Sequence, residues 1–235
     1  MFRIIPLAVI ISLSVITETS GIGSAYPVYQ ALSRHDTIIE DQILYNGRIW
    51  RNAYLNLEND QFLFTTEFLP GSVTMNGKCF TGIVIKYDIY NDEIITKADI
   101  PGLVQLNKEM VDSFSFSFQN KTYRFSKMTS DTLSVLRGYV NVLYRGKSAL
   151  CQRYIKELYH MSGQNVNDKF FQKNLLYFVR DNAIFTINSK RDLFNIFKKE
   201  KPQIREFIRK NNLEVTKREP ESFVPVVKYI DDLIQ

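Results

Sequence analysis

Cysteine, histidine and glycine are scarce in this 235-residue chain, and each shortage excludes a class of chemistry. The two cysteines, Cys79 and Cys151, do not form a C-x-x-C motif, which excludes a thioredoxin-type redox site and a cysteine-rich zinc site. A Ser-His-acid triad would need His35 or His160, and no G-x-S-x-G motif presents a serine nucleophile. Only ten glycines occur, and they form no Walker A or dinucleotide-binding pattern. We therefore expect neither a catalytic site of these types nor a cofactor.

Adjacent carboxylates occur at Glu40-Asp41, Asp92-Glu93 and Asp231-Asp232. Neighbouring residues of a strand point to opposite faces, so adjacency does not create the facing pair of a glycosidase. Solvation of turns and helix ends explains these pairs better, and we expect a protein that is not an enzyme. A carboxylate-based hydrolase acting on a glycan is the alternative, and it requires two acids that converge across a cleft from separate elements.

The longest apolar run is confined to the N-terminus. A basic start, Met1-Phe2-Arg3, precedes the apolar residues 4–16, and a polar stretch with small residues at Gly23 and Ala25 follows. This order is typical of a signal peptide, and we predict residues 1–25 as the signal, with cleavage after Ala25. The run of 13 residues is shorter than the roughly 20 that a membrane-spanning helix needs. The sequence thus predicts an exported protein, periplasmic, secreted or on the cell surface, whose mature chain has no transmembrane span.

Strand-like patterns dominate the sequence between residues 41 and 188. Residues 113–118 read Ser-Phe-Ser-Phe-Ser-Phe, and this alternation is a strong signal of a half-buried strand. Turns at Asn76-Gly77 and Asn91-Asp92 separate strand-like segments. We also predict a tight hairpin around Asn46-Gly47 and a last hairpin around Arg180-Asp181-Asn182. We predict an α+β, mainly β fold, in which an antiparallel meander occupies residues 41–188 after a lead-in segment at 26–40. A curved sheet and a partly open barrel both fit this pattern.

Residues 189–235 show helical periodicity instead. Ser189 is a predicted N-cap with Asp192 as its acidic partner, and Pro202 and Pro220 suit the first turns of two further helices. Apolar residues recur at spacings of three and four in each segment. We expect two or three short C-terminal helices that pack on the β domain.

Five aromatic residues of one predicted hairpin share a face: Phe114, Phe116, Phe118, Tyr123 and Phe125. Such a face could line a cavity for a lipid or another apolar ligand. It could equally fill the core, which is the commoner place for apolar rings.

Positive charge gathers towards the C-terminus. Residues 167–218 contain 13 Lys and Arg against six Asp and Glu, whereas the whole chain has a net charge of +5. The helical periodicity predicts a positive surface that binds an anionic envelope component or a protein partner, formed by Lys198, Lys199, Lys201, Arg205 and Arg209. A solvated helix surface is the alternative. Export argues against a nucleic-acid partner.

Cys79 and Cys151 are candidates for a disulfide bond, because an exported protein meets an oxidising compartment. Two buried free thiols are the alternative, since the geometry of a disulfide is strict.

A resemblance to other proteins rests on the segments YNGRIW at 45–50, KYDIYNDEI at 86–94 and LYFVRDNAIFTINSKRDLFNIF at 176–197, with the predicted helix at 204–211. In these segments the chain resembles a group of uncharacterised exported proteins of the Gram-negative bacterial envelope. The resemblance implies an envelope location, a β-rich body and a helical ending, without a particular activity. We therefore predict an exported, non-enzymatic envelope protein that acts as a binding or interaction module of unknown ligand. A structural assembly subunit that uses exposed sheet edges is a further alternative.

Overall fold

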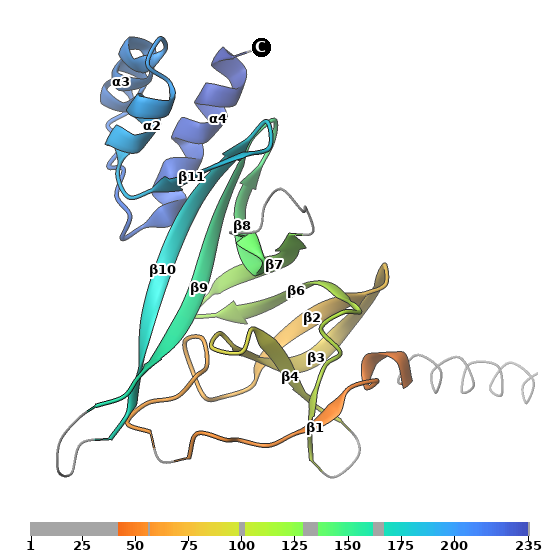
Figure 1. The fold of residues 1–235 in the computed structure, drawn as a ribbon. Coiled ribbons are helices and arrows are strands. Elements are labelled where there is room, and N and C mark those ends of the chain that lie inside the picture. The colour runs from red at the N-terminus through yellow and green to blue at the C-terminus, as the bar shows by residue number, and fades with distance from the viewer. Residues whose placement is uncertain (1–41, 56, 99–101, 129–135, 162–166, 235) are drawn as a thin grey trace, which may run out of the picture. The chain divides into compact units, whose positions relative to one another are not determined.

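The computed structural model describes residues 42–55, 57–98, 102–128, 136–161 and 167–234 (Figure 1). The predicted signal peptide, its cleavage point after Ala25 and the lead-in segment lie outside these residues. The described residues belong to one compact unit.

Within the described residues, 11 antiparallel strands form a single sheet (Figure 1). From one edge to the middle, its strands are β1 (Arg48–Trp50), β5 (Leu103–Gln105), β4 (Glu93–Lys97), β3 (Lys78–Asp88) and β2 (Leu69–Met75). The order continues to the other edge with β6 (Val111–Phe118), β7 (Lys121–Met128), β8 (Gly138–Arg145), β9 (Ala149–Tyr159), β10 (Lys169–Arg180) and β11 (Ala183–Ile187). The predicted mainly β meander is confirmed, and the sheet stays open instead of closing into a barrel.

Short helices follow the sheet, as the sequence predicts: α2 (Lys190–Ile196), α3 (Lys201–Lys210), the 3₁₀ turn η2 (Pro220–Phe223) and α4 (Val224–Leu233). The predicted cap starts α2, because Ser189 Oγ accepts the Arg191 backbone N–H at 3.2 Å and Asp192 Oδ2 accepts the Ser189 N–H at 2.8 Å. Among the described helices, none has the length and apolar character that crossing a membrane requires.

Several turns lie where the sequence predicts them, because Gly, Asn and Asp tolerate a left-handed backbone. Asn76 and Gly77 have φ angles of 48° and 78° between β2 and β3. Asp181 and Asn182 have φ angles of 49° and 60° between β10 and β11. These residues reverse the chain in two residues and set the register of their hairpins.

The predicted hairpin around Asn46-Gly47 is wrong. Residues 42–44 form a helical turn, and β1 pairs with the distant strand β5. Gly47 lies so close to β5 that a Cβ atom would sit 2.0 Å from the backbone oxygen of Gln105. The glycine thus serves the close approach of two distant segments and not a local turn.

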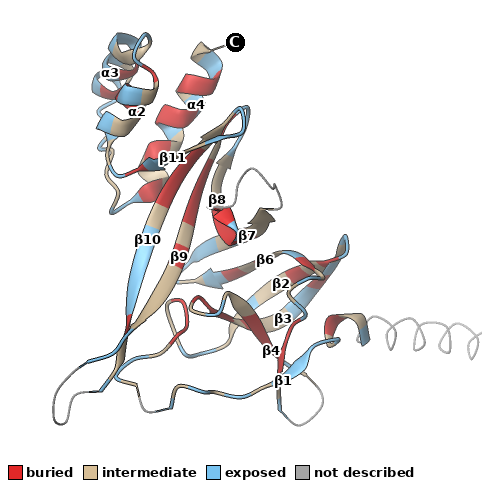
Figure 2. Ribbon diagram, in the orientation of Figure 1, coloured by how far each residue is buried: buried red, intermediate tan, exposed pale blue. Residues whose placement is uncertain are grey.

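Two large hydrophobic clusters organise the unit. One is rich in aromatic residues and is built on β2–β7, and the other packs α2, α3 and α4 against β9, β10 and β11. Figure 2 shows the buried residues of α4 and the adjoining parts of β9 and β10, whereas the part of β10 towards Lys169 is largely exposed. Stacked rings of Phe207 and Tyr229, with centroids 4.1 Å apart, join α3 to α4.

A buried carboxylate fastens α4 to the sheet. Asp231 is 4% exposed and accepts hydrogen bonds from the Ser148 backbone N–H at 2.9 Å, the Ser148 hydroxyl at 2.7 Å and the Tyr144 hydroxyl at 3.1 Å. Arg180 Nη1 lies 3.5 Å from Asp231 Oδ1, the oxygen that accepts from the Ser148 hydroxyl. Burial alone would raise the pKa of Asp231, but the Ser148 and Tyr144 hydrogen bonds and the Arg180 charge outweigh it and lower the pKa. The expectation that Asp231 is a solvated helix-end acid is therefore wrong.

Candidate functional site

The aromatic face predicted as a ligand site belongs to the core. Phe114, Phe116 and Phe125 are each at most 3% exposed and stack on one another, with centroids of Phe114 and Phe125 4.7 Å apart. Phe118 and Tyr123 are half-buried and pack against Phe64, whose ring centroid is 5.0 Å and 4.6 Å from theirs. Other rings occupy the space that an apolar ligand would need, so these five residues fill the core.

The disulfide between Cys79 and Cys151 is not formed, and both are free thiols. Cys79 is exposed on β3, and Cys151 is fully buried on β9, several strands away in the sheet. Burial raises the pKa of the Cys151 thiol to about 11, so this cysteine is protonated and unreactive at neutral pH. The alternation of apolar and polar residues identified the strands of Cys79 and Cys151, but it could not show that these two strands are not neighbours in the sheet.

The predicted basic residues separate into two groups. Arg205 and Arg209 of α3 meet Lys190 and Arg191 of α2 around a hollow of about 480 Å³, which we call the helical hollow. Its remaining lining consists of Phe194, Ile208, Asn212 and Leu213. Lys198, Lys199 and Lys201 lie outside this lining, on the connection between the two helices and at the start of α3.

Local structure explains why these four cations converge. The Ser189 cap places Lys190 and Arg191 in the first turn of α2. On α3, Arg205 and Arg209 are four residues apart and share a face, while Ile204 and Ile208 are buried. The Arg205 guanidinium lies 5.2 Å from the centroid of the Phe194 ring, close enough for a cation–π interaction.

The helical hollow carries unbalanced positive charge. No carboxylate is among its described lining residues, and in the described part of the chain no ion pair joins any of its four cations to an acid. Its lining also lacks a histidine, a carboxylate or a thiol for proton transfer or nucleophilic attack. Arginine and lysine donors at such a surface can bind an anion, and they offer no acid–base chemistry near neutral pH.

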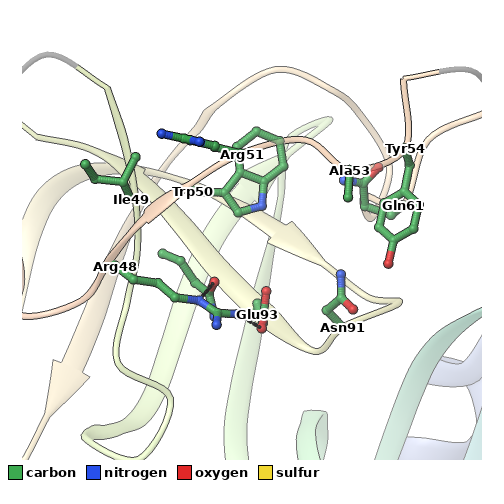
Figure 3. A pocket seen from close by; sticks show the side chains of 10 residues that line it. Arg48, Ile49, Trp50, Arg51, Ala53, Tyr54, Gln61, Asn91 and Glu93 are labelled. Atoms are coloured by element: carbon green, nitrogen blue, oxygen red, sulfur yellow. Dashed lines mark hydrogen bonds and ion pairs between the residues drawn. The ribbon is translucent and has the colours of Figure 1, made fainter.

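A second hollow, of about 390 Å³, lies beside β1 (Figure 3). We call it the β1 hollow, and its lining includes Arg48, Trp50, Tyr54, Gln61, Glu93 and Gln105. Here the cation is partnered: Arg48 Nε donates to Gln105 Oε1 at 2.6 Å, and Arg48 Nη2 lies 3.2 Å from Glu93 Oε1. Burial raises the pKa of Glu93, and the Arg48 charge opposes that shift.

Sequence reasoning missed the β1 hollow. It treated Glu93 only as one of an adjacent pair and did not single out Trp50 or Tyr54. The signal available was Trp50 itself, because the chain has a single tryptophan and it directly follows the Arg48-Ile49 pair of β1. The sequence could not predict that Gln105 lies beside Arg48, because this contact depends on the pairing of β1 with β5.

Metal binding has no support among the described residues, where no group of three or more His, Cys, Asp or Glu side chains is placed to hold an ion. His160 is exposed, and its Nδ1 lies 2.6 Å from Asp168 Oδ2. No family model, curated protein or solved structure matches this chain. The resemblance to exported envelope proteins stays a prediction from the sequence.

Proposed function

We propose that this protein is a non-enzymatic binding module of the bacterial envelope, and that it recognises an anionic group on an envelope component at the helical hollow. The observation that carries the proposal is the convergence of Lys190, Arg191, Arg205 and Arg209 on one concave surface whose described lining contains no acid. Phosphate is the group that suits it best, because arginine presents paired N–H donors that match phosphate oxygens.

The geometry favours selective binding over general attraction. Cations scattered on a surface are screened by salt over about 8–10 Å and attract anions weakly. In the helical hollow two helices hold the four cations around a common space, and the Phe194 ring supports one guanidinium. A bound anion therefore receives several charge-assisted hydrogen bonds together.

Calorimetric titration of the purified exported protein with inorganic pyrophosphate tests the proposal. The double variant Arg205→Gln/Arg209→Gln is expected to bind at least about tenfold more weakly, since each lost charged hydrogen bond matters on the scale of about 1.5–3 kcal/mol. The matched control is Lys198→Gln/Lys199→Gln, which removes the same charge from positions outside the lining. An equal loss of pyrophosphate affinity in both variants would show that diffuse surface charge, and not the helical hollow, binds the anion. An absence of binding in the wild type would overturn the proposal.

Vesicles identify the source of the phosphate. Binding to phosphatidylglycerol vesicles but not to phosphatidylcholine vesicles indicates a lipid head group, provided that Arg205→Gln/Arg209→Gln weakens vesicle binding more than Lys198→Gln/Lys199→Gln does. Binding of pyrophosphate alone indicates a phosphate on a soluble or polymeric component.

Export is tested separately by the intact mass of the protein recovered from its native envelope. The sequence predicts a mature chain that begins at Tyr26. A mass that retains residues 1–25 would show an uncleaved N-terminal segment and would contradict the predicted processing.

A further inference from the structure

We infer that the β1 hollow is a second, independent binding site, and that its ligand is an uncharged sugar unit of a saccharide. Three features of the hollow carry the inference: aromatic rings held in fixed positions, a polar side that both donates and accepts hydrogen bonds, and an arginine that is paired with a carboxylate. The paired arginine and the acceptor carboxylate have no counterpart among the described lining residues of the helical hollow.

The aromatic side of the hollow is rigidly supported. Trp50 packs on Phe62, with ring centroids 5.9 Å apart. Tyr54 meets the rings of Tyr90 and Phe170 edge-on, each at 5.4 Å. In Figure 3 the ring of Trp50, at the end of β1, and the ring of Tyr54, on the segment that follows, flank the space above Asn91 and Glu93. Sugar rings present flat C–H faces, and an aromatic ring fixed in this way can pack against such a face and still leave its polar edge free.

The polar side of the hollow suits hydroxyl groups. A hydroxyl both donates and accepts, so it is best served by a mixture of donors and acceptors. Arg48 supplies donors, Glu93 supplies acceptor oxygens, and the Gln105 amide supplies both. The bonds from Arg48 to Gln105 and Glu93 hold these groups in place before a ligand arrives. Binding therefore costs little side-chain ordering.

The balance of charge argues against an anionic ligand here. Arg48 and Glu93 form an ion pair. Arg51 is the second arginine of the lining, and Figure 3 shows its side chain directed away from the space between Trp50 and Glu93. A phosphate entering the hollow would approach the Glu93 carboxylate, and like charges at close range disfavour binding. A neutral polyhydroxy ligand meets no such repulsion.

The site is suited to binding and not to hydrolysis. A glycosidase needs two carboxyl groups across the scissile bond. Glu93 is the one carboxylate among the described lining residues. The nearby Asp88 is fully buried, and its oxygens accept from the backbone N–H groups of Tyr90 and Asn91 and from the Asn91 side chain, each at 2.9 Å. The volume of about 390 Å³ lies near the lower end of the roughly 300–1,000 Å³ of small-molecule pockets, which suits a short saccharide.

Trp50 provides a direct readout, because it is the single tryptophan of the chain and lines the hollow. We expect its fluorescence to change in a saturable way when the purified protein is titrated with a panel of neutral oligosaccharides, including glucose and N-acetylglucosamine oligomers. Glycerol at equal hydroxyl concentration is the solvent control. The titration is carried out at about 300 mM salt, where exposed charges are screened beyond a few ångströms. Success or failure here is therefore independent of anion binding at the helical hollow.

Variants complete the experiment. Arg48→Gln changes a side chain that is 73% exposed, so folding is not at risk, and it is expected to weaken sugar binding about tenfold or more. Glu93→Gln is expected to act in the same direction, while Arg124→Gln removes an exposed arginine on β7 and serves as the matched control. Saturable binding that both Arg48→Gln and Glu93→Gln leave unchanged would overturn the inference. So would the absence of a fluorescence change with every oligosaccharide, or release of reducing ends, which would identify an enzyme instead.

Discussion

The helical hollow and the β1 hollow have similar volumes, about 480 Å³ and 390 Å³, but they treat their arginines in opposite ways. In the helical hollow, Arg205 rests on an aromatic ring and has no carboxylate partner in the described lining. In the β1 hollow, Arg48 is bonded to both a carboxylate and an amide. The same residue type can therefore attract an anion in one place and orient hydroxyl-binding groups in another, and its immediate partners decide which.

The two hollows also depend on different parts of the core. The β1 hollow is connected to the aromatic cluster through β4 and β5, which carry Glu93 and Gln105 of its lining and Ile94 and Val104 of the cluster. The helical hollow depends on the cluster of α2, α3 and α4, which the Asp231 interactions fasten to the sheet. A substitution that destabilises one of the two clusters is therefore expected to weaken ligand binding at the hollow that this cluster supports more than binding at the other hollow.

The largest expected effect comes from Phe125→Ala. This side chain is 1% exposed and stacks on Phe114, so its removal leaves a cavity in the aromatic cluster. We expect the free energy of unfolding to fall by about 4 kcal/mol, as measured by denaturant titration. Stability close to the wild-type value would show that the ring has free space around it. That result would favour the alternative that the aromatic face lines a cavity for an apolar ligand.

A slightly smaller loss is expected from Asp231→Asn, which acts on the other support. The substitution removes the buried carboxylate partner of Arg180, whose side chain is 15% exposed and keeps its Nε 3.4 Å from Asp181 Oδ2. We expect a cost of about 3 kcal/mol, the lower end of the range for breaking a buried pair. Since α4 is stacked on α3 through Tyr229 and Phe207, pyrophosphate binding should weaken more than sugar binding does under conditions where the variant is folded. Asp232→Asn, at the exposed neighbouring position, is the control and should change neither property.

The effect of Asp231→Asn is also expected to depend on pH. The pKa of Asp231 is lowered in the folded protein, so the folded state binds this proton less readily than the unfolded state. The stabilisation is therefore fully present above the ordinary aspartate pKa of about 4 and is lost as the pH falls through the lower folded value. Unfolding curves at neutral pH and near pH 2 should show a gap between wild type and variant that narrows in acid. A constant gap would assign the loss to packing.

The smallest expected effect is a difference between the two hollows in how ligand affinity depends on salt concentration. Raising sodium chloride from about 20 mM to about 300 mM should weaken pyrophosphate binding by roughly tenfold, because the cations of the helical hollow are exposed and screened. Sugar binding at the β1 hollow should change by less than about twofold, since the interaction involves an internally paired arginine and a neutral ligand. A steep salt dependence at both sites would contradict the distinction between them.

Local features of this fold were predictable from sequence, whereas distant contacts were not. The Ser189 cap, the alternating strand of residues 113–118 and the Asn76-Gly77 turn depend on neighbours within a few residues, and the structure contains all three. The pairing of β1 with β5 depends on segments far apart in the chain, so its pattern suggested a local hairpin instead. For the same reason neither the burial of Asp231 nor the β1 hollow was foreseen.

The candidate sites show the same limit. Periodicity correctly placed Arg205 and Arg209 on one exposed face of α3, but the contribution of Lys190 and Arg191 required the packing of α2 beside it. Separating the lining cations from Lys198, Lys199 and Lys201 required the same information. Charge counted along a sequence locates a basic region, and only the fold identifies which charges share a space.

The crowding around Gly146 has an evolutionary consequence. A Cβ atom at this position would lie 2.2 Å from the Tyr144 hydroxyl and 2.7 Å from Asp231 Oδ2. A larger residue at position 146 would therefore displace the Tyr144 hydroxyl and the Asp231 carboxylate, which hold α4 on the sheet. If either side chain were replaced, the space that requires a glycine at 146 would no longer be crowded. Gly146, Tyr144 and Asp231 should accordingly be inherited and replaced as a set, so that descendants of this chain that lose one of them have lost or redesigned the other two.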